Sequence, residues 1–321
     1  LIGRLDDLLQ TDADDIANFI EGLLEQGALY STYYEDILYI YPPEMYVSEV
    51  ESVHYTKDFL LEADPISLDI PSFIEKFEAD NHIIFGDAQK EAIQLSFFEK
   101  FSLITGGPGT GKTTIIKALV KGFQLGGLGR IILCAPTGRA AKRLTEATEF
   151  EATTIHRLLV PVQGSDSYDF TKNEDDPLDI DVIIIDEASM LNVRLFYSLM
   201  AAIRKEAHVI IVGDVDQLPP IGAGFVLKDL LDSDCVPYTR LNQIYRQSSG
   251  NTIVESAYAI NRGEMPKLDS LSEEFSFIPV KSYDMMMKAI IDVYKREQEH
   301  IEDELDIQII SPMRRGEAGS I

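Results

Sequence analysis

The chain has 321 residues, of which 45% are hydrophobic and 26% charged, which is typical of a globular protein with room for more than one domain. Its formal net charge of −26 excludes attraction to nucleic acid by the overall field, so any DNA contact needs a local cationic groove. No apolar run has the length of a membrane span, and the first residues show no signal peptide. Because the chain lacks an initiator Met, we expect it to begin inside a longer protein.

The two cysteines, Cys134 and Cys235, have no partner at metal-ligand spacing and are too few for a disulfide framework. Each lies near an apolar run that resembles a strand, so we expect both to be small buried hydrophobes. This cysteine usage is typical of a reducing compartment, and we predict a cytoplasmic protein.

The N-terminal region, 1–80, is predicted to be a small, mainly helical accessory region. Apolar residues recur at helical spacing within Leu1–Tyr30, and Ile37–Ile40 has the pattern of a short strand. Val47–Leu61 and Ile66–Glu78 predict further helices. The order of these elements along the chain resembles that of a winged helix. We favour a small accessory helical domain over a separate wing that reads DNA.

From Phe101 onward, strands that are apolar throughout alternate with helices. This alternation predicts an α/β domain whose parallel sheet is covered by helices on both faces. The predicted strands are Phe101–Thr105, Ile131–Ala135, Val182–Ile185 and Val209–Val212, with helices beginning near Lys112, Gly138 and Leu191. Gln308–Ser311 predicts one more strand.

The segment Gly106-Gly107-Pro108-Gly109-Thr110-Gly111-Lys112-Thr113 fits the pattern G-x-x-x-x-G-K-[ST] between a strand and a helix. Glycines let the backbone wrap closely around phosphate, and the helix N-terminus points free amides at the anion. A lysine in this place neutralises the β- and γ-phosphates, while the threonine hydroxyl binds Mg²⁺. The predicted nucleotide-binding residues are Gly107, Pro108, Gly109, Thr110, Gly111, Lys112, Thr113 and Thr114.

Two later strands end in polar residues. Val182–Ile185 is followed by Asp186, which can hold Mg²⁺ together with Thr113, and by Glu187, which can polarise the attacking water. Ligands of α/β proteins bind at the carboxyl edge of the sheet, where these strands end. After the next strand, Gln217 could reach the γ-phosphate, although taken alone it resembles a solvated loop glutamine.

The polar, acidic segment 163–181 leaves two interpretations open. A hairpin insertion that splits a duplex would use Tyr168 and Phe170, its only aromatic residues, to stack on the junction base pair. An acidic exposed loop is the other interpretation, and we favour it slightly because the carboxylates in this segment would repel phosphates.

An ordered set of motifs from about Asp87 onward resembles the RecD-like 5′→3′ DNA helicases of superfamily 1, also known as the exodeoxyribonuclease V α-subunit family. The order and spacing carry the resemblance more than any single motif does. The motifs are Gln89, the P-loop, Ala135–Ala141, Thr154–Leu159, Asp186–Met190, Gly213–Pro219 and Ile244–Gln247, with Ala259–Gly263 and Ser311–Gly316 as weaker matches.

The resemblance assigns roles to several residues. Gln89 would read the adenine edge, which makes the nucleotide ATP, and Gln217 would couple the γ-phosphate to movement of the DNA site. Arg246 would act as an arginine finger on the γ-phosphate. The resemblance thus implies Lys112, Glu187, Gln217 and Arg246 as the catalytic residues.

Single-stranded DNA would bind at the ends of two neighbouring strands. Backbone amides and hydroxyls there can hold phosphates without reading base identity. The predicted DNA-binding residues are Pro136, Thr137, Arg139, Thr154, His156 and Arg157. For His156, a structural role as a helix-capping histidine is an equally weighted alternative.

The resemblance implies a RecA-like motor domain over 81–305 and the start of a second, truncated motor domain over 306–321. The implied function is ATP-dependent 5′→3′ unwinding of DNA in repair or recombination, with single-stranded or 5′-tailed DNA and recombination-complex subunits as partners. Because unwinding needs two motor halves, we expect this chain alone to bind nucleotide but to unwind poorly. A nucleotide-regulated DNA-binding or scaffold module and a non-helicase P-loop ATPase remain as alternatives.

Overall fold

The computed structural model of the chain describes residues 5, 12–60, 66–164, 168–242, 252–266, 268, 275–301, 306–311 and 316. The chain forms two compact units, Leu1–Arg246 and Gln247–Ile321. The first unit contains the accessory region and the whole sheet. The proposed domain limits at 80, 305 and 306 remain predictions.

The accessory region consists of a helix, a β-hairpin and a second helix. Helix α2 (Ala13–Glu25) is followed by strands β1 (Tyr30–Tyr34) and β2 (Ile37–Tyr41), and then by α3 (Pro43–Phe59). Glu35 and Asp36 connect the two strands with φ of 48° and 62°, the left-handed conformation that tight hairpin turns require. The predicted strand Ile37–Ile40 is therefore the second arm of a hairpin that lies between the two helices.

The central sheet is fully parallel, as predicted, and its six strands are ordered β5-β4-β6-β7-β3-β8. Two strands were not predicted, namely β5 and β8. The strands are β3 (Phe101–Gly106), β4 (Ile131–Ala135), β5 (Ala152–Thr154), β6 (Val182–Ile185), β7 (His208–Gly213) and β8 (Tyr238–Leu241).

Alternate residues of the strands feed two separate cores, one on each face of the sheet. Phe101 and Leu103 pack into one core, while Ile104, on the same strand, packs into the other. Because helices cover both faces of the sheet, the side chains on either face are removed from water. This explains why apolar residues in these strands do not alternate with polar ones. The fold is thus a three-layer α/β arrangement of the RecA-like P-loop class.

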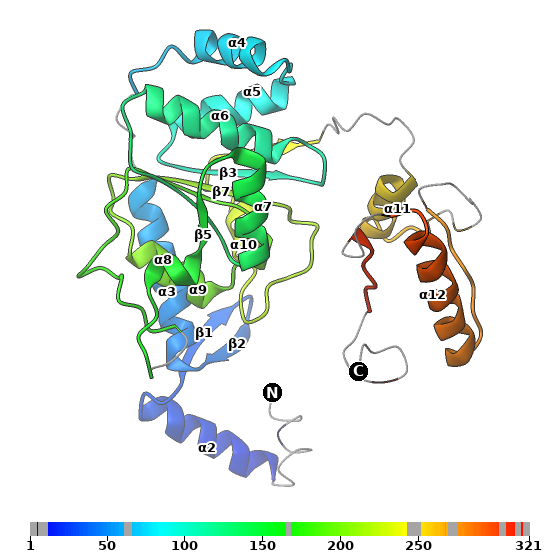
Figure 1. Cartoon of the computed structure of the whole chain (residues 1–321). Coiled ribbons are helices and arrows are strands. Elements are labelled where there is room, and N and C mark those ends of the chain that lie inside the picture. The colour runs from blue at the N-terminus through cyan, green and yellow to red at the C-terminus, as the bar shows by residue number, and fades with distance from the viewer. Residues whose placement is uncertain are drawn as a thin grey trace. The chain divides into compact units, whose positions relative to one another are not determined.

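Helices cover both faces of this sheet (Figure 1). One layer contains α4 (Ile70–Asn81), α5 (Asp87–Phe98), α6 (Lys112–Leu125) and α7 (Gly138–Thr148). The opposite layer contains α3, α8 (Ile155–Leu159), α9 (Val193–Ala201) and α10 (Val226–Asp232). The accessory helix α3 packs on α9 and places Phe59 in the core, so this part of the accessory region is integral to the domain that contains the sheet.

The second unit contains helices α11 (Thr252–Asn261) and α12 (Tyr283–Gln298). Helix α12 buries none of its side chains fully. The strand predicted at Gln308–Ser311 is wrong, because this stretch is irregular. Its apolar residues lack a strand partner within the described part of the unit.

The two cysteines differ. Cys134 is buried on β4, as expected, and burial raises the pKa of its thiol. The expectation for Cys235 is wrong: it is exposed, because it lies in the loop between α10 and β8 rather than on the strand. In the part of the chain that the structure describes, no helix has the length and apolar character of a membrane span.

Candidate nucleotide-binding site

The glycine-rich loop follows β3 and leads directly into α6. Gly109 and Gly111 have φ of 80° and 84°, a conformation that residues with a side chain rarely adopt. A Cβ on Gly106 would lie 2.8 Å from Leu241 Cβ and 2.9 Å from Thr110 Oγ1. The glycines are therefore required by the backbone path and by the close packing of β3 against β8.

Lys112, the first residue of α6, folds over the loop that precedes it. Its Nζ donates hydrogen bonds to the carbonyl oxygens of Gly106 at 2.5 Å and Gly107 at 3.0 Å. Its positive charge also acts on the carboxyls of Asp186 and Asp214, where it opposes the rise in pKa that burial causes. The ammonium group is thus the central cation of the site. Thr113 and Thr114 follow it at half-buried positions in the first helical turn.

Gln89 lies behind the loop, in the first turn of α5. Its Nε2 donates to the carbonyl oxygen of Thr110 at 2.9 Å, and its Oε1 accepts from the backbone N–H of Gly86 at 3.0 Å. Only 4% of the residue is exposed. The carboxamide therefore braces the glycine-rich loop through contacts that the sequence did not predict, and its role at the adenine remains a prediction.

Asp186 and Glu187 follow β6, which is separated from β3 by β7 alone. Burial raises the pKa of Asp186 to about 6, and the charge of Glu187 adds to this, while a backbone hydrogen bond and Lys112 oppose it. Glu187 has φ of 55°, a left-handed conformation that costs a non-glycine residue free energy and tends to occur at functional sites. Both carboxylates thus lie at the carboxyl edge of the sheet, on the turn that leads into the short 3₁₀ helix η1 (Ala188–Met190).

The donors at this edge fit a magnesium ion. Mg²⁺ prefers hard oxygen ligands and is usually held by one or two carboxylates, phosphate oxygens and waters. Asp186 supplies a half-buried carboxylate whose ionised form is disfavoured by burial, so a nearby divalent cation would relieve that cost. No group of three or more His, Cys, Asp or Glu occurs among the described residues that could hold a metal without phosphate.

A third polar group follows β7. Asp214 is buried, and burial raises the pKa of its carboxyl, assisted by the charge of Asp216. Gln217 is exposed, and its Oε1 accepts a hydrogen bond from Ser189 Oγ at 3.2 Å. The contact joins the loop after β7 to the turn after β6. The sequence motifs contained Asp214 and Ser189, but no pattern indicated that they flank Gln217.

The predicted DNA-binding residues lie beyond the nucleotide site, on two adjacent strands. Strand β4 pairs with β5, with Ala135 opposite Thr154. Thr137 lies two residues after β4 and Thr154 is the last residue of β5, and each caps the next helix, accepting from the N–H groups of Ala140 and Arg157 at 3.2 Å. The structure therefore brings the two predicted DNA segments together, with Pro136 half-buried and Arg139 and Arg157 exposed.

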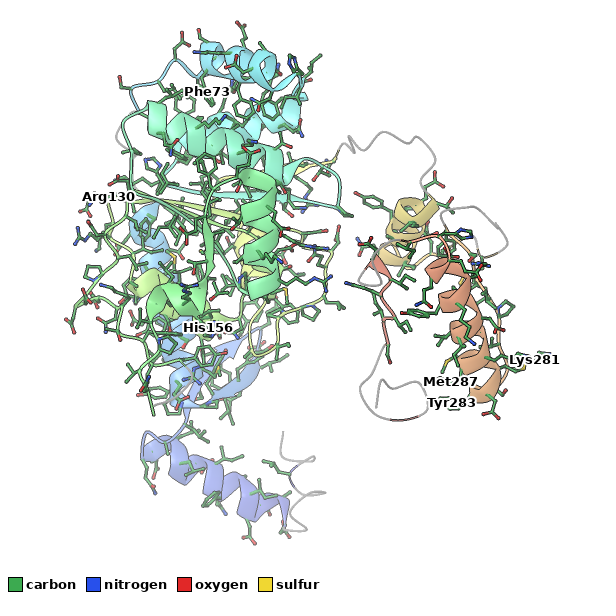
Figure 2. The ribbon with its side chains drawn as sticks, in the orientation of Figure 1. Phe73, Arg130, His156, Lys281, Tyr283 and Met287 are labelled. Atoms are coloured by element: carbon green, nitrogen blue, oxygen red, sulfur yellow. The ribbon has the colours of Figure 1, made fainter. Side chains whose placement is uncertain are left out.

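His156 has a structural environment. Its ring lies against Phe170, with centroids 5.7 Å apart in an edge-on arrangement, and burial lowers the pKa of the imidazole. Figure 2 shows its place in the helical layer opposite the one that contains Phe73. A neutral imidazole attracts phosphate weakly, so the contacts favour the structural alternative for this residue.

Segment 163–181 begins within a short antiparallel pairing. Pro161 forms a bridge with Phe170, flanked by hydrogen bonds from Val162 N to Asp169 O and from Thr171 N to Val160 O, both 2.9 Å. Phe170 is buried in the core beneath this hairpin. Stacking of Phe170 on a base pair, one of the two interpretations left open for this segment, disagrees with this burial, because its ring completes the protein interior.

Tyr168 is held by helix α9. Its hydroxyl accepts from Asn192 Nδ2 at 2.8 Å, and the guanidinium of Arg194 lies 4.3 Å from the centre of its ring. Residues 165–167 and Arg246, the predicted arginine finger, lie outside the described residues.

The comparisons agree with this geometry. A family model described as "AAA domain" matches residues 89–223, from Gln89 through the loop after β7. The ATP-dependent RecD2 DNA helicase of Deinococcus radiodurans is 44% identical over 164 residues, which cover 51% of this chain and 22% of that protein. The RecBCD enzyme subunit RecD of Mycobacterium tuberculosis is 37% identical over 202 residues, which cover 56% of this chain and 35% of that protein.

A crystal structure of the Pif1 helicase from Candida albicans aligns with a TM-score of 0.44 and 18% identity, covering 68% of this chain and 56% of that one. The chain spans about a fifth to a third of the length of the two curated relatives. Over the matched residues the chain is thus similar to RecD helicases, and the match includes the P-loop and the strands that follow it.

Proposed function

We propose that the protein is an ATP-dependent 5′→3′ DNA helicase of repair or recombination, which couples hydrolysis of Mg²⁺-ATP to movement along single-stranded DNA. The observation that carries this proposal is the meeting of three polar strand ends at one sheet edge. Lys112, Asp186 and Asp214 interact there electrostatically, and Gln217 bonds to the turn after Asp186.

In the proposed reaction, the amides at the start of α6 and Lys112 hold the β- and γ-phosphates. To do so, the Lys112 ammonium exchanges its two loop carbonyls for phosphate oxygens, which are stronger acceptors. Thr113 and Asp186 would hold Mg²⁺, which supplies charge neutralisation on the phosphates when bound. Glu187 orients the attacking water and accepts its proton, while Gln217 contacts the γ-phosphate or that water.

Two further roles rest on the family. Arg246 would stabilise the charge that develops on the transferred phosphoryl group. A second motor domain would supply the facing half of the ATP site, and its start is proposed over 306–321. Complex subunits of recombination are proposed partners, since the M. tuberculosis relative is named a RecBCD subunit.

DNA is proposed to cross the edge formed by β4 and β5. Thr137 and Thr154 accept from their own helices but keep hydroxyl protons to donate to phosphates. Arg139 and Arg157 add positive charge next to these caps. Contacts of this kind do not read bases, so binding should be sequence-tolerant and weaken with salt.

The proposal is tested by measuring ATP hydrolysis with and without single-stranded DNA, and unwinding of 5′-tailed and 3′-tailed duplexes. We expect DNA to stimulate hydrolysis and only the 5′-tailed duplex to be unwound. Lys112→Ala should abolish tight nucleotide binding. Lys117→Ala, on the same helix and paired with Glu149, is the matched control and should bind normally.

The second candidate is a nucleotide-regulated module that binds DNA or scaffolds a complex without translocating, and the net charge of −26, which opposes attraction to DNA, favours its scaffold form. For that candidate, nucleotide would change DNA affinity but no duplex would be unwound, even by a form containing the second motor domain. Hydrolysis that is indifferent to DNA would instead indicate a P-loop ATPase of another kind.

A further inference from the structure

The carboxamide of Gln217 is held from both sides by residues that none of the roles above includes. We propose that Ser189 and Asp214 are positioning residues for Gln217, and that they tie its orientation to the turn carrying Glu187. The inference rests on the proposed function, because it concerns how this site hydrolyses ATP.

Ser189 fixes the oxygen end of the carboxamide. Its Oγ donates to Gln217 Oε1 at 3.2 Å. Ser189 lies in η1, two residues after Glu187, so the bond connects the residue proposed to contact the γ-phosphate with the segment that carries the proposed base. An exposed glutamine would otherwise sample several rotamers, and each hydrogen bond narrows that range.

Asp214 acts on the other end of the carboxamide. Its carboxyl accepts from the backbone N–H of Asp216 at 3.1 Å, and interaction with the Gln217 side chain lowers its pKa. An ionised carboxylate only accepts, so the end of Gln217 that it favours is Nε2. Together with the bond from Ser189 to Oε1, this favours one of the two orientations of the amide. The turn is closed by Gln217 N, which donates to Asp214 O at 3.2 Å.

The two segments also meet through their backbones. A Cβ placed on Gly213 would lie 3.2 Å from Ser189 N and 3.3 Å from Ala188 N, so only glycine leaves this distance unstrained. Asp214, the next residue, senses the charge of Lys112. The contacts therefore connect the turn at Asp214 and Gln217 to η1, and the charge of Lys112 acts on that turn through Asp214.

This path predicts an effect on turnover rather than on nucleotide affinity. Gln217 and Glu187 act on the γ-phosphate and its water, whereas the affinity comes mainly from the glycine-rich loop. Loss of the Ser189 hydroxyl should lower kcat roughly three- to tenfold, the scale for losing one orienting hydrogen bond, and leave KM for ATP nearly unchanged. Ser189→Thr keeps a hydroxyl and should restore most of the rate.

The experiment compares Ser189→Ala, Ser189→Thr, Gln217→Ala and the double variant Ser189→Ala/Gln217→Ala in the full chain, measuring kcat and KM for ATP with single-stranded DNA. Ser198→Ala is the matched control, since its hydroxyl bonds only the Arg194 carbonyl within α9. If Ser189 acts through Gln217, removing its hydroxyl costs nothing further once Gln217 is alanine. The proposal would be overturned if Ser189→Ala lowered kcat equally in the wild type and in Gln217→Ala, or if it left kcat unchanged in the wild type.

A second readout separates this inference from the proposed function. If the wild-type chain hydrolyses no ATP, the helicase proposal fails, and amide hydrogen exchange of residues 214–218 tests the contact instead. Ser189→Ala should then speed exchange at Asp216 and Gln217, whose amides close the turn, while Ser198→Ala should not. Unchanged exchange in Ser189→Ala would overturn the positioning role as well.

Discussion

Gln89 and Thr110 are joined by a 2.9 Å hydrogen bond from the Gln89 Nε2 to the Thr110 carbonyl oxygen, beneath the glycine-rich loop. The same carboxamide accepts from Gly86 N, so a single buried side chain connects the start of α5 to the loop. The two bonds restrain the loop from the side of α5. The loop is thereby prepared for nucleotide by a residue proposed to face the adenine.

We therefore expect Gln89→Ala to weaken binding of both ATP and GTP, by about tenfold, because the loss of a buried hydrogen bond to the loop affects every triphosphate. The proposed contact with adenine should make the loss larger for ATP. Titration with fluorescent ATP and GTP analogues measures both. An unchanged affinity for GTP would show that the brace does not contribute to binding.

Gly111 provides a sharper test of the loop. Its φ is 84°, and a Cβ there would lie 2.2 Å from Gln89 Nε2, so Gly111→Ala both strains the backbone and displaces the brace. Nucleotide affinity should fall by well over tenfold, because two stabilising features of the loop are lost together.

Gly127→Ala is the matched control for Gly111→Ala. Gly127 has φ of 94° but nothing within 4 Å of an added Cβ. It should lose about 1 kcal/mol of unfolding free energy to backbone strain and bind nucleotide normally. Similar affinities for the two variants would contradict the role assigned to Gly111.

Phe170 separates a structural from a DNA-stacking role for the 160–171 hairpin. It is 8% exposed and packs in the core, so Phe170→Ala should lower the free energy of unfolding by about 3 kcal/mol. Phe98→Ala is the control, since Phe98 is 65% exposed and should change stability by less than about 0.5 kcal/mol. Urea unfolding measures both, and a Phe170→Ala variant as stable as Phe98→Ala would contradict the burial of this ring.

The sequence predicted the parts of the fold whose signal is local. Strands β3, β4, β6 and β7 are mostly apolar because most of their residues are buried on the two faces of the sheet. The P-loop was visible because its backbone path requires glycines at fixed positions. Strand β8 was missed because it is an edge strand in which exposed Tyr238 and Arg240 alternate with buried Thr239 and Leu241. In a single sequence, a four-residue strand with alternating exposed and buried residues has the same pattern as a loop.

In the candidate site, too, the residues with a local sequence signal were predicted and the contacts between distant segments were not. Asp186 and Glu187 follow an apolar strand, which is visible along the chain, whereas the contacts of Gln217 depend on residues up to 28 positions away. Phe170 was misread because the surrounding acidic residues suggested a solvated segment, while the chain returns to the core at that one point. Contacts between loops, and single buried apolar residues within a loop, produce no repeating hydrophobic pattern in the sequence. They can therefore be found only in the structure.

Asp214 links the site to the pH dependence of stability. Burial raises the pKa of its carboxyl, the charge of Asp216 adds to this, and the effect is reduced by Lys112 and by hydrogen bonds from Asp216 N and Gln217. The folded protein thus binds this proton more tightly than the unfolded chain, whose carboxyl has a pKa of 3.8. The resulting stabilisation is fully present at a pH below the pKa of Asp214 in the unfolded chain. It is lost as the pH rises through the pKa of Asp214 in the folded protein.

Asp214→Asn removes this titration while keeping an oxygen that can accept from Asp216 N. The free energy of unfolding of the wild type, relative to that of the variant, should therefore decrease as the pH is raised above the unfolded pKa of 3.8 and through the higher folded pKa. Urea unfolding of both proteins at several pH values within this interval measures the difference. A difference that is constant with pH, or that grows in favour of the wild type, would mean that the Asp214 carboxylate is stabilised in the fold by Lys112 and its hydrogen bonds more than it is destabilised by burial.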